Sequence, residues 1–276
     1  MKRQRQRQAP VHRGTTHQPR RTALPALLAL WLAVPLTPLL LWAGAARWSG
    51  TARLPQDFGF HGWQDALNAG MVAALIRSVL LGAAVTLIAT PLGVMAGRAL
   101  GWRLLRRPAL PSVVLLGPVV LAPVAVAMGL DVVILRLGIP GEVAVILVLS
   151  VFALPYTTFT MRAAYLGLDP ALEEQARVLG ASARQARRRV TLPAATTGIV
   201  TATGLAFLVG WSDYAVTLLI GGGQIVTAPM LIGSFAAGSG NDALTSILAI
   251  SASLPPLAAL AIFAYAASHR RTAAHA

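Results

Sequence analysis

The chain has 276 residues, of which 56% are apolar and 12% are charged, and its formal net charge is +14. Soluble domains carry about 25% charged residues, so this composition excludes most soluble folds and predicts a protein embedded in a membrane. The basic residues stand in short runs between apolar stretches, which is typical of loops beside anionic lipid headgroups, and we expect no nucleic acid among the partners.

The polar, basic composition of residues 1–22 predicts a disordered cytoplasmic tail. Six apolar stretches follow this tail. A helix needs about 20 mostly apolar residues to cross a bilayer. The stretches of this length lie at about 23–46, 75–96, 109–130, 143–161, 198–220 and 244–267. The sequence therefore predicts an all-α polytopic membrane protein of six transmembrane helices, with a five-helix core at 75–268 and a cytoplasmic tail at 269–276.

The first stretch has one alternative interpretation, because Ala43, Gly44 and Ala45 resemble a signal-peptide cleavage site. Its apolar length of about 24 residues exceeds the 7–15 of a signal sequence, so we expect a retained helix. Residues 47–74 are mixed in character and predict an external loop. Neighbouring helices can satisfy the carbonyls that a proline frees, so we expect kinks rather than helix ends at Pro91, Pro118, Pro123, Pro155, Pro255 and Pro256.

The second stretch carries Gly93 and Gly97 four residues apart, which places two small residues on one helix face. Such a face lets two helix backbones approach closely in a membrane. We expect it to serve packing inside the subunit, and a contact between subunits is the alternative.

The distribution of arginine and lysine predicts the orientation. The tail, the second and fourth connecting loops and the C-terminus together hold 19 of the 23 basic residues. Because basic loops stay on the cytoplasmic side, this predicts that both termini are cytoplasmic and that the number of spans is even.

The fourth connecting loop, 162–197, carries the strongest local signals in the chain. Asp169 is a good N-cap and Pro170 suits a first helical position, which predicts a helix over Ala171–Leu179. Gly180 follows where a left-handed residue commonly ends a helix. The first half of this loop is therefore predicted to be a short helix closed by a glycine.

A second helix is predicted directly after this glycine. Ser182 and Gln185 have the spacing of a capping box, which starts a helix at Ala183. We expect this helix to run to about Val190 and to stop at Pro193 before the next span. The loop thus predicts a helix–glycine–helix elbow on the cytoplasmic surface.

Charged residues on the elbow allow two interpretations. Glu174 and Arg177 are three apart and can pair locally, while Arg184, Arg187 and Arg188 are spaced to share one face. The elbow is then either a plain surface that faces solvent and headgroups or the docking site of a partner.

The stretch from Leu172 to Pro193 resembles the EAA loop of binding-protein-dependent ABC importer permeases. That pattern is Glu-Ala-Ala, three residues, Gly, and a Leu-Pro about a dozen residues later. The residues that match in register are Glu174, Ala176, Gly180, Leu192 and Pro193. Gln175 replaces the middle Ala, and Arg187 stands where an aromatic residue is common, which suggests a more acidic partner surface.

The resemblance extends from about Leu75 to the end of the chain. Four further segments are similar to permeases of the spermidine/putrescine branch: Phe152–Pro155, Ala206–Leu208, Trp211–Tyr214 and Thr227–Pro229. The loop motif is a strong indicator of the family, whereas these four segments are weak indicators of the solute.

The resemblance implies a function and a set of partners. The elbow would dock on one of two cytoplasmic ABC ATPases, two permease subunits (identical or sister chains) would enclose the pathway, and an external binding protein would deliver the solute. The residues implied in ATPase coupling are Glu174, Gln175, Ala176, Gly180, Arg184, Arg187, Leu192 and Pro193. Lys2 is the only lysine, so a G-x-x-x-x-G-K-[ST] phosphate loop is excluded and ATP hydrolysis is expected in a partner.

Asp213 is the acidic residue that falls inside a predicted span. Such residues usually face a cavity, so Asp213 could line the pathway with Trp211, Ser212 and Tyr214. The alternative is that the helix ends near Gly210 and leaves Asp213 at the outer interface, with Trp211 and Tyr214 as interfacial belt residues.

Other function classes receive little support. All histidines lie outside the predicted spans and no His/acid group has metal-ligand spacing, so we expect no catalysis, metal or cofactor in this chain. Cysteine is absent, which excludes disulfides and thiol chemistry. The alternatives that stay open are a secondary carrier or channel that works alone and a membrane scaffold that transports nothing.

Overall fold

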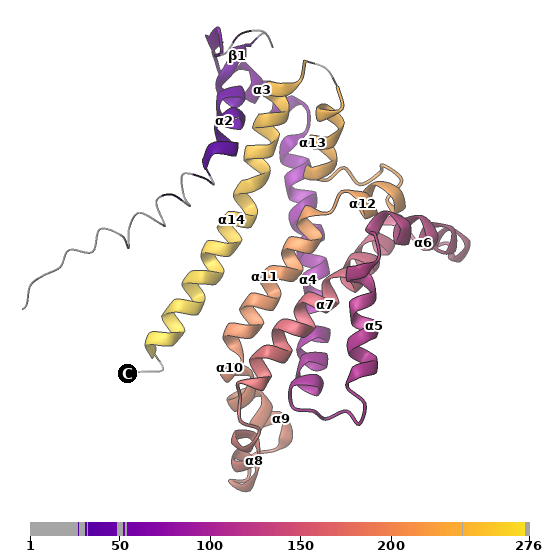
Figure 1. Ribbon diagram of the computed structural model, residues 1–276, viewed down its shortest axis with the longest axis vertical. Coiled ribbons are helices and arrows are strands. Elements are labelled where there is room, and N and C mark those ends of the chain that lie inside the picture. Colours follow the sequence, from indigo (N-terminus) through magenta and orange to yellow (C-terminus); the bar gives the residue numbers. More distant parts are fainter. Residues whose placement is uncertain are drawn as a thin grey trace, which may run out of the picture.

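The computed structural model describes residues 27, 31, 33–48, 52, 54–238 and 240–273. The basic tail predicted at 1–22 and most of the first predicted span lie outside these residues. Within them the chain is a bundle of helices with one two-stranded ribbon at one end (Figure 1).

Four long helices form the frame of the bundle: α4 (Met71–Gly101), α7 (Gly141–Leu166), α11 (Thr196–Ser212) and α14 (Asp242–Ala273). Apolar residues cover almost the whole circumference of each helix, as expected for helices surrounded by lipid and other helices. The helices α4 and α7 lie side by side, and α11 packs against both (Figure 1). The main hydrophobic core lies between them and includes Val85, Leu149 and Ala206.

The third predicted span is not one continuous helix. It is divided into α5 (Ala109–Val120) and α6 (Pro123–Leu137), which meet at an angle of 99°. Leu121 and Ala122 have extended backbones, with ψ of 137° and 126°. The ring of Pro123 disfavours the helical conformation for the residue before it, so the proline starts a new helix and does not merely kink the old one.

The fifth predicted span also ends early. The helix α11 stops at Ser212, Asp213 is extended, and a separate short helix, α12 (Ala215–Ile220), follows. A helix that the sequence analysis did not predict, α13 (Ala228–Ala236), comes next, and its first N–H group donates a 2.8 Å hydrogen bond to the Ser78 hydroxyl of α4.

The N-terminal part of the described chain contains η1 (Val34–Leu36) and α2 (Thr37–Gly44), which packs on α14. The helix ends at Gly44, two residues before the predicted end of the first span, because the next residues form β1 (Ala45–Arg47). This strand pairs antiparallel with β2 (Asp57–Phe58). The external loop predicted at 47–74 therefore contains a strand, the helix α3 (His61–Asn68) and the start of α4.

The remaining elements are four short helical turns between α7 and α11: α8 (Ala171–Val178), α9 (Ala183–Ala186), η2 (Arg187–Thr191) and α10 (Leu192–Ala194). Within the described residues, three helices are long and apolar enough to cross a membrane, or up to five if each bent pair counts as one span. The count of six stays a prediction.

Candidate functional site

The segment that contains α8, α9, η2 and α10, here called the elbow, forms one end of the molecule. It projects beyond the ends of α4, α7 and α11, at the end opposite to α3 and α13 (Figure 1). The elbow is therefore accessible to a partner that approaches the bundle along its long axis.

The first half of the elbow is closed by its predicted glycine. The carboxylate of Asp169 accepts a 2.9 Å hydrogen bond from the N–H of Ala171 at the start of α8. At the other end, Gly180 has φ +91° and its N–H bonds to the Arg177 carbonyl, while the N–H of Ala181 bonds to the Ala176 carbonyl. This pair of bonds is a Schellman motif, which requires the left-handed residue that glycine provides.

The second half begins at the predicted capping box but continues differently from the prediction. The hydroxyl of Ser182 accepts from the Gln185 N–H at 3.3 Å, and the Gln185 side chain accepts from the Ser182 N–H at 2.9 Å. The α-helix ends at Ala186 rather than Val190, and η2 is a π-helical turn. Pro193 lacks an N–H and its ring crowds the carbonyl four residues earlier, so a wider turn fits directly before it.

Pro193 does not stop the helix, contrary to the prediction. It lies near the start of α10, and the chain bends by 75° between the turns at 183–194 and α11. Leu192 is half-buried beside it and Pro193 itself is exposed. The bend at Ala195 therefore separates the elbow from the next long helix.

The helix α8 carries three of the eight predicted coupling residues. Glu174 and Gln175 are exposed, and Ala176 is half-buried. The tip of the elbow is apolar, since Val178 is 87% and Leu179 is 88% exposed. Arg184 and Arg187, the two arginines predicted to take part in coupling, are also exposed. The elbow thus exposes an acidic residue, an apolar tip and several arginines.

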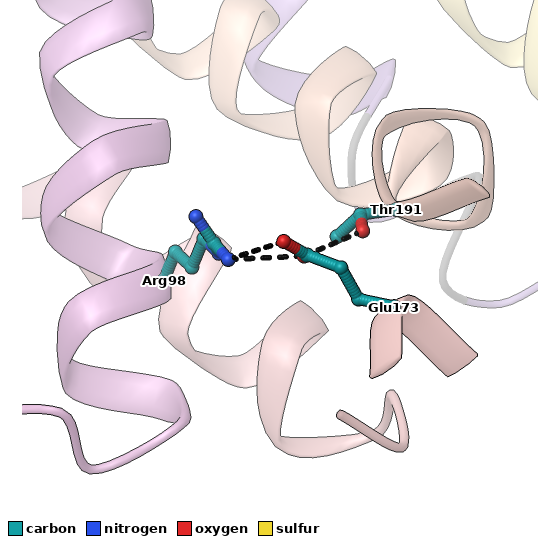
Figure 2. A network of polar contacts seen from close by, with 3 residues as sticks. All are labelled: Arg98, Glu173 and Thr191. Atoms are coloured by element: carbon teal, nitrogen blue, oxygen red, sulfur yellow. Dashed lines mark hydrogen bonds and ion pairs between the residues drawn. The ribbon is translucent and has the colours of Figure 1, made fainter. Parts of the chain in front are cut away.

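The predicted Glu174–Arg177 pair is absent, and the neighbouring Glu173 makes an ion pair instead. The carboxylate of Glu173 lies 2.8 and 3.0 Å from one guanidinium nitrogen of Arg98, at the C-terminal end of α4. It also accepts a 2.9 Å hydrogen bond from the Thr191 hydroxyl, as Figure 2 shows. Sequence reasoning missed this contact because Arg98 and Glu173 are 75 residues apart and no local pattern joins them.

A second feature, here called the groove, lies between α5, α7, α11 and α12. It has a volume of about 390 Å³ and an apolar lining that is interrupted by four polar residues, Tyr156, Ser212, Asp213 and Tyr214. Three of the four residues predicted to line a pathway therefore border one cavity. Tyr156 was not predicted, because a tyrosine within an apolar span has no local signal that distinguishes cavity from lipid.

The fourth predicted pathway residue, Trp211, lies elsewhere. The residue is 5% exposed, and its ring stacks on Phe207 with ring centres 5.9 Å apart and packs in a cluster with Ala228 and Ala252. Adjacent residues on a helix point about 100° apart, so Trp211 faces α13 and α14 while Ser212 faces the groove.

Asp213 has a structural contact as well as a place in the groove. Its carboxylate accepts hydrogen bonds from the N–H and the hydroxyl of Thr217, at 2.8 and 2.9 Å, and a longer one from the N–H of Val216. A negative charge at the start of α12 is favourable because the first N–H groups of a helix have no partner within it. In the described part of the chain, no group of three or more His, Asp or Glu residues could hold a metal ion.

Comparison with known proteins gives one family for this arrangement. Residues 89–274 match the family described as the binding-protein-dependent transport system inner membrane component. The chain is 34% identical over 213 residues to the trehalose transport system permease protein SugB of Mycobacterium tuberculosis, covering 72% of this chain and 74% of that one. It is 31% identical over 206 residues to a probable ABC transporter permease protein, y4fN, of Sinorhizobium fredii, of which it covers 34%.

A solved structure has the same fold. The crystal structure of a bacterial ABC transporter involved in the import of the acidic polysaccharide alginate superposes with a TM-score of 0.67 at 14% identity. The match covers 87% of this chain and 93% of that one. At this identity the likeness concerns the arrangement of the helices and not the cargo.

Proposed function

The chain belongs to the family of binding-protein-dependent transport system inner membrane components, and from this premise we propose that the elbow receives the movement of a cytoplasmic ATPase. The chain is the transmembrane subunit of an ABC importer and lies, as a multi-pass protein, in the inner membrane. Membership implies three kinds of partner: an ATPase, a second permease subunit and a solute-binding protein. We propose two ATPase copies for each pair of permease subunits.

The observation that carries this proposal is the exposed surface of the elbow. Two large apolar side chains at its tip, Val178 and Leu179, are almost fully exposed, although burial in an interface would stabilise them. Capping of α8 and α9 holds this surface in one conformation before a partner arrives, which lowers the ordering cost of docking. The arginines beside the tip favour an acidic rim on the partner.

The direction of the chain in the membrane belongs to the same proposal. An ATPase is cytoplasmic, so the elbow end of the bundle faces the cytoplasm. The helix α14 runs from the opposite end toward the elbow end (Figure 1), and this direction supports a cytoplasmic C-terminus. The excess of arginine in the elbow and after α4 supports this orientation, and an even number of spans brings the N-terminus to the same side.

We propose that the groove is this subunit's part of the solute pathway. It is bordered by two helix breaks, between α5 and α6 and between α11 and α12, and broken helices at membrane depth usually line cavities. We also propose that the chain belongs to the spermidine/putrescine branch of the family, because four of its sequence segments resemble permeases of that branch. The relative SugB is named for trehalose, which is not a polyamine, so solute binding by the partner binding protein is the direct measurement.

Copurification with the ATPase tests the role of the elbow. In the complex of the chain with its ATPase, Glu174→Arg should weaken binding by about 30-fold, the effect of losing an interface residue that contributes roughly 2 kcal/mol. Gly180→Pro should release the ATPase as well, because proline cannot adopt the positive φ of this position.

The matched control is Glu142→Arg, which changes another exposed glutamate, at the opposite end of α7, and should leave ATPase binding unchanged. Equal binding by Glu174→Arg and the wild-type chain would contradict the proposal. A wild-type chain that takes up solute alone, driven by an ion gradient, would contradict the importer assignment altogether.

A further inference from the structure

We propose that Arg98 is the positioning residue through which the elbow moves the transmembrane bundle, and that the adjacent Glu173 and Glu174 have different tasks. Glu173 faces inward and holds α8 to α4, while Glu174 faces the ATPase. This inference rests on the proposed function of the elbow and assigns the residues that connect it to the groove.

The contact is the one ion pair found among the described residues of the chain. The carboxylate of Glu173 is fully engaged, because Arg98 approaches both of its oxygens and the Thr191 hydroxyl donates to one of them (Figure 2). Three elements thus meet at one carboxylate: the C-terminal end of α4, the first turn of α8 and the end of η2.

The contact is also poorly accessible to water. The side chains of Arg98 and Glu173 are 21% and 11% exposed, and Thr191 is buried. The space left between Glu173 and its neighbours is about 10 Å³, which holds at most one water molecule. An ion pair with so little solvent is stronger and more directional than a surface pair, whose charges are screened.

The backbone arrangement makes this side-chain contact the principal link between α8 and α4. The backbone of α8 packs mainly against α9 and η2, within the elbow itself. A force applied to the outer face of α8 therefore reaches α4 chiefly through the Glu173 carboxylate. The same carboxylate, through its bond with Thr191, holds η2, which leads into the bend before α11.

Arg98 is itself held firmly to the bundle. Its guanidinium lies over the Trp102 ring, 4.7 Å from the ring centre. The indole N–H of Trp102 donates to the carbonyls of Tyr165 and Leu168, at 3.1 and 3.2 Å. These bonds join the end of α4 to the end of α7, so a displacement of Arg98 is passed to both helices.

The helix α7 completes the connection to the groove. It packs along α4 over much of its length and contributes Leu149, Phe152 and Tyr156 to the lining of the groove. The path from the Glu173 carboxylate to the groove therefore consists of packed and hydrogen-bonded groups, which is the physical requirement for coupling two distant sites.

The test uses a reporter that does not require the solute. The chain has no cysteine, so Ser212→Cys places a single thiol in the groove. In the reconstituted complex with the ATPase, the rate of maleimide labelling of this thiol, with and without a non-hydrolysable ATP analogue, reports whether the groove responds to nucleotide. ATP hydrolysis and ATPase copurification are measured on the same samples.

The informative variants are Glu173→Gln and the pair Arg98→Met/Glu173→Met, which leaves no unpaired buried charge. We expect both to retain ATPase binding and ATP hydrolysis, and the double variant to retain thermal stability as well, while the nucleotide-dependent change in labelling rate falls about tenfold in both. Arg106→Met, which changes an exposed arginine outside the contact, should keep the full response. The exchanged pair Arg98→Glu/Glu173→Arg, which rebuilds the ion pair in the opposite sense, should recover much of the response.

Two outcomes would overturn the inference. One is a full labelling response in the Arg98→Met/Glu173→Met variant, which would show that movement passes by another route. The other is loss of ATPase binding in that variant, which would make the contact part of the docking surface. If the wild-type complex neither binds an ATPase nor responds to nucleotide, the proposed function fails instead, before any variant is compared.

Discussion

At the scale of single residues, Asp213 combines the two interpretations that its sequence allows. The helix α11 ends one residue before it, two residues later than the interfacial interpretation expects, and its carboxylate caps α12. The same carboxylate borders the groove, as the pathway interpretation expects. A half-buried acid with both contacts stabilises the helix break and presents a negative charge to the cavity.

Asp213→Asn separates these contributions. Asparagine keeps an oxygen that can accept from Thr217, so α12 should stay capped and membrane insertion should be unchanged. Uptake in cells that depend on the importer should fall about tenfold if the charge meets the solute, since a charged hydrogen bond contributes roughly 1.5–3 kcal/mol. Asp131→Asn, in α6 and away from the groove, is the matched control. Wild-type uptake by Asp213→Asn would remove this charge from the pathway.

At the scale of elements, small residues on α4 decide how closely the backbones of α4 and α7 can approach each other. Three glycines recur every fourth residue on α4 and face three residues that recur at the same interval on α7: Gly93, Gly97 and Gly101 against Thr157, Met161 and Tyr165. The expectation that Gly93 and Gly97 serve close helix packing is confirmed, and the packing lies within the subunit.

Gly97→Val should destabilise this contact. A Cβ atom at position 97 would lie 2.8 Å from the backbone nitrogen of Arg162, so the helices would have to separate. Overpacking of this kind costs about 1–3 kcal/mol, which should appear as a lower thermal unfolding temperature in detergent. Gly129→Val in α6 is the control, because a Cβ atom there would meet nothing within 4 Å. Equal unfolding temperatures for the two variants would contradict the close packing.

The same contact bears on two of the prolines in the predicted spans. Pro91 and Pro155 lie inside α4 and α7, where the packing of these helices on each other keeps each one continuous. Pro123 follows α5, which has no buried residue, although Pro118 within α5 leaves that helix continuous. The intrinsic preference of proline prevails at Pro123, and the helix breaks.

At the scale of the whole molecule, the orientation in the membrane can be measured with a matched pair of cysteines. Ala183 on the elbow and Ala237 after α13 are both exposed alanines at opposite ends of the bundle (Figure 1). In this cysteine-free chain, an impermeant maleimide should label Ala237→Cys from outside intact cells and Ala183→Cys only in inverted membranes. The reverse pattern would contradict a cytoplasmic elbow.

The sequence by itself determined the helical membrane class, the approximate places of the long helices, and the caps at which α8 ends and α9 begins. Those features depend on apolar length and on capping residues only a few positions from the groups they cap, such as Ser182 with Gln185 and Gly180 with Arg177. The Schellman motif and the capping box therefore form where local chemistry predicts them.

Only the tertiary structure decided which prolines break a helix, that Trp211 and Ser212 face different sides, and that Glu173 rather than Glu174 forms the buried ion pair. Each of these depends on what packs against a residue from a distant part of the chain. Arg98 and Glu173 are 75 positions apart, and their carboxylate–guanidinium contact exists because α4, α7 and η2 bring them together. No pattern within one segment contains that information.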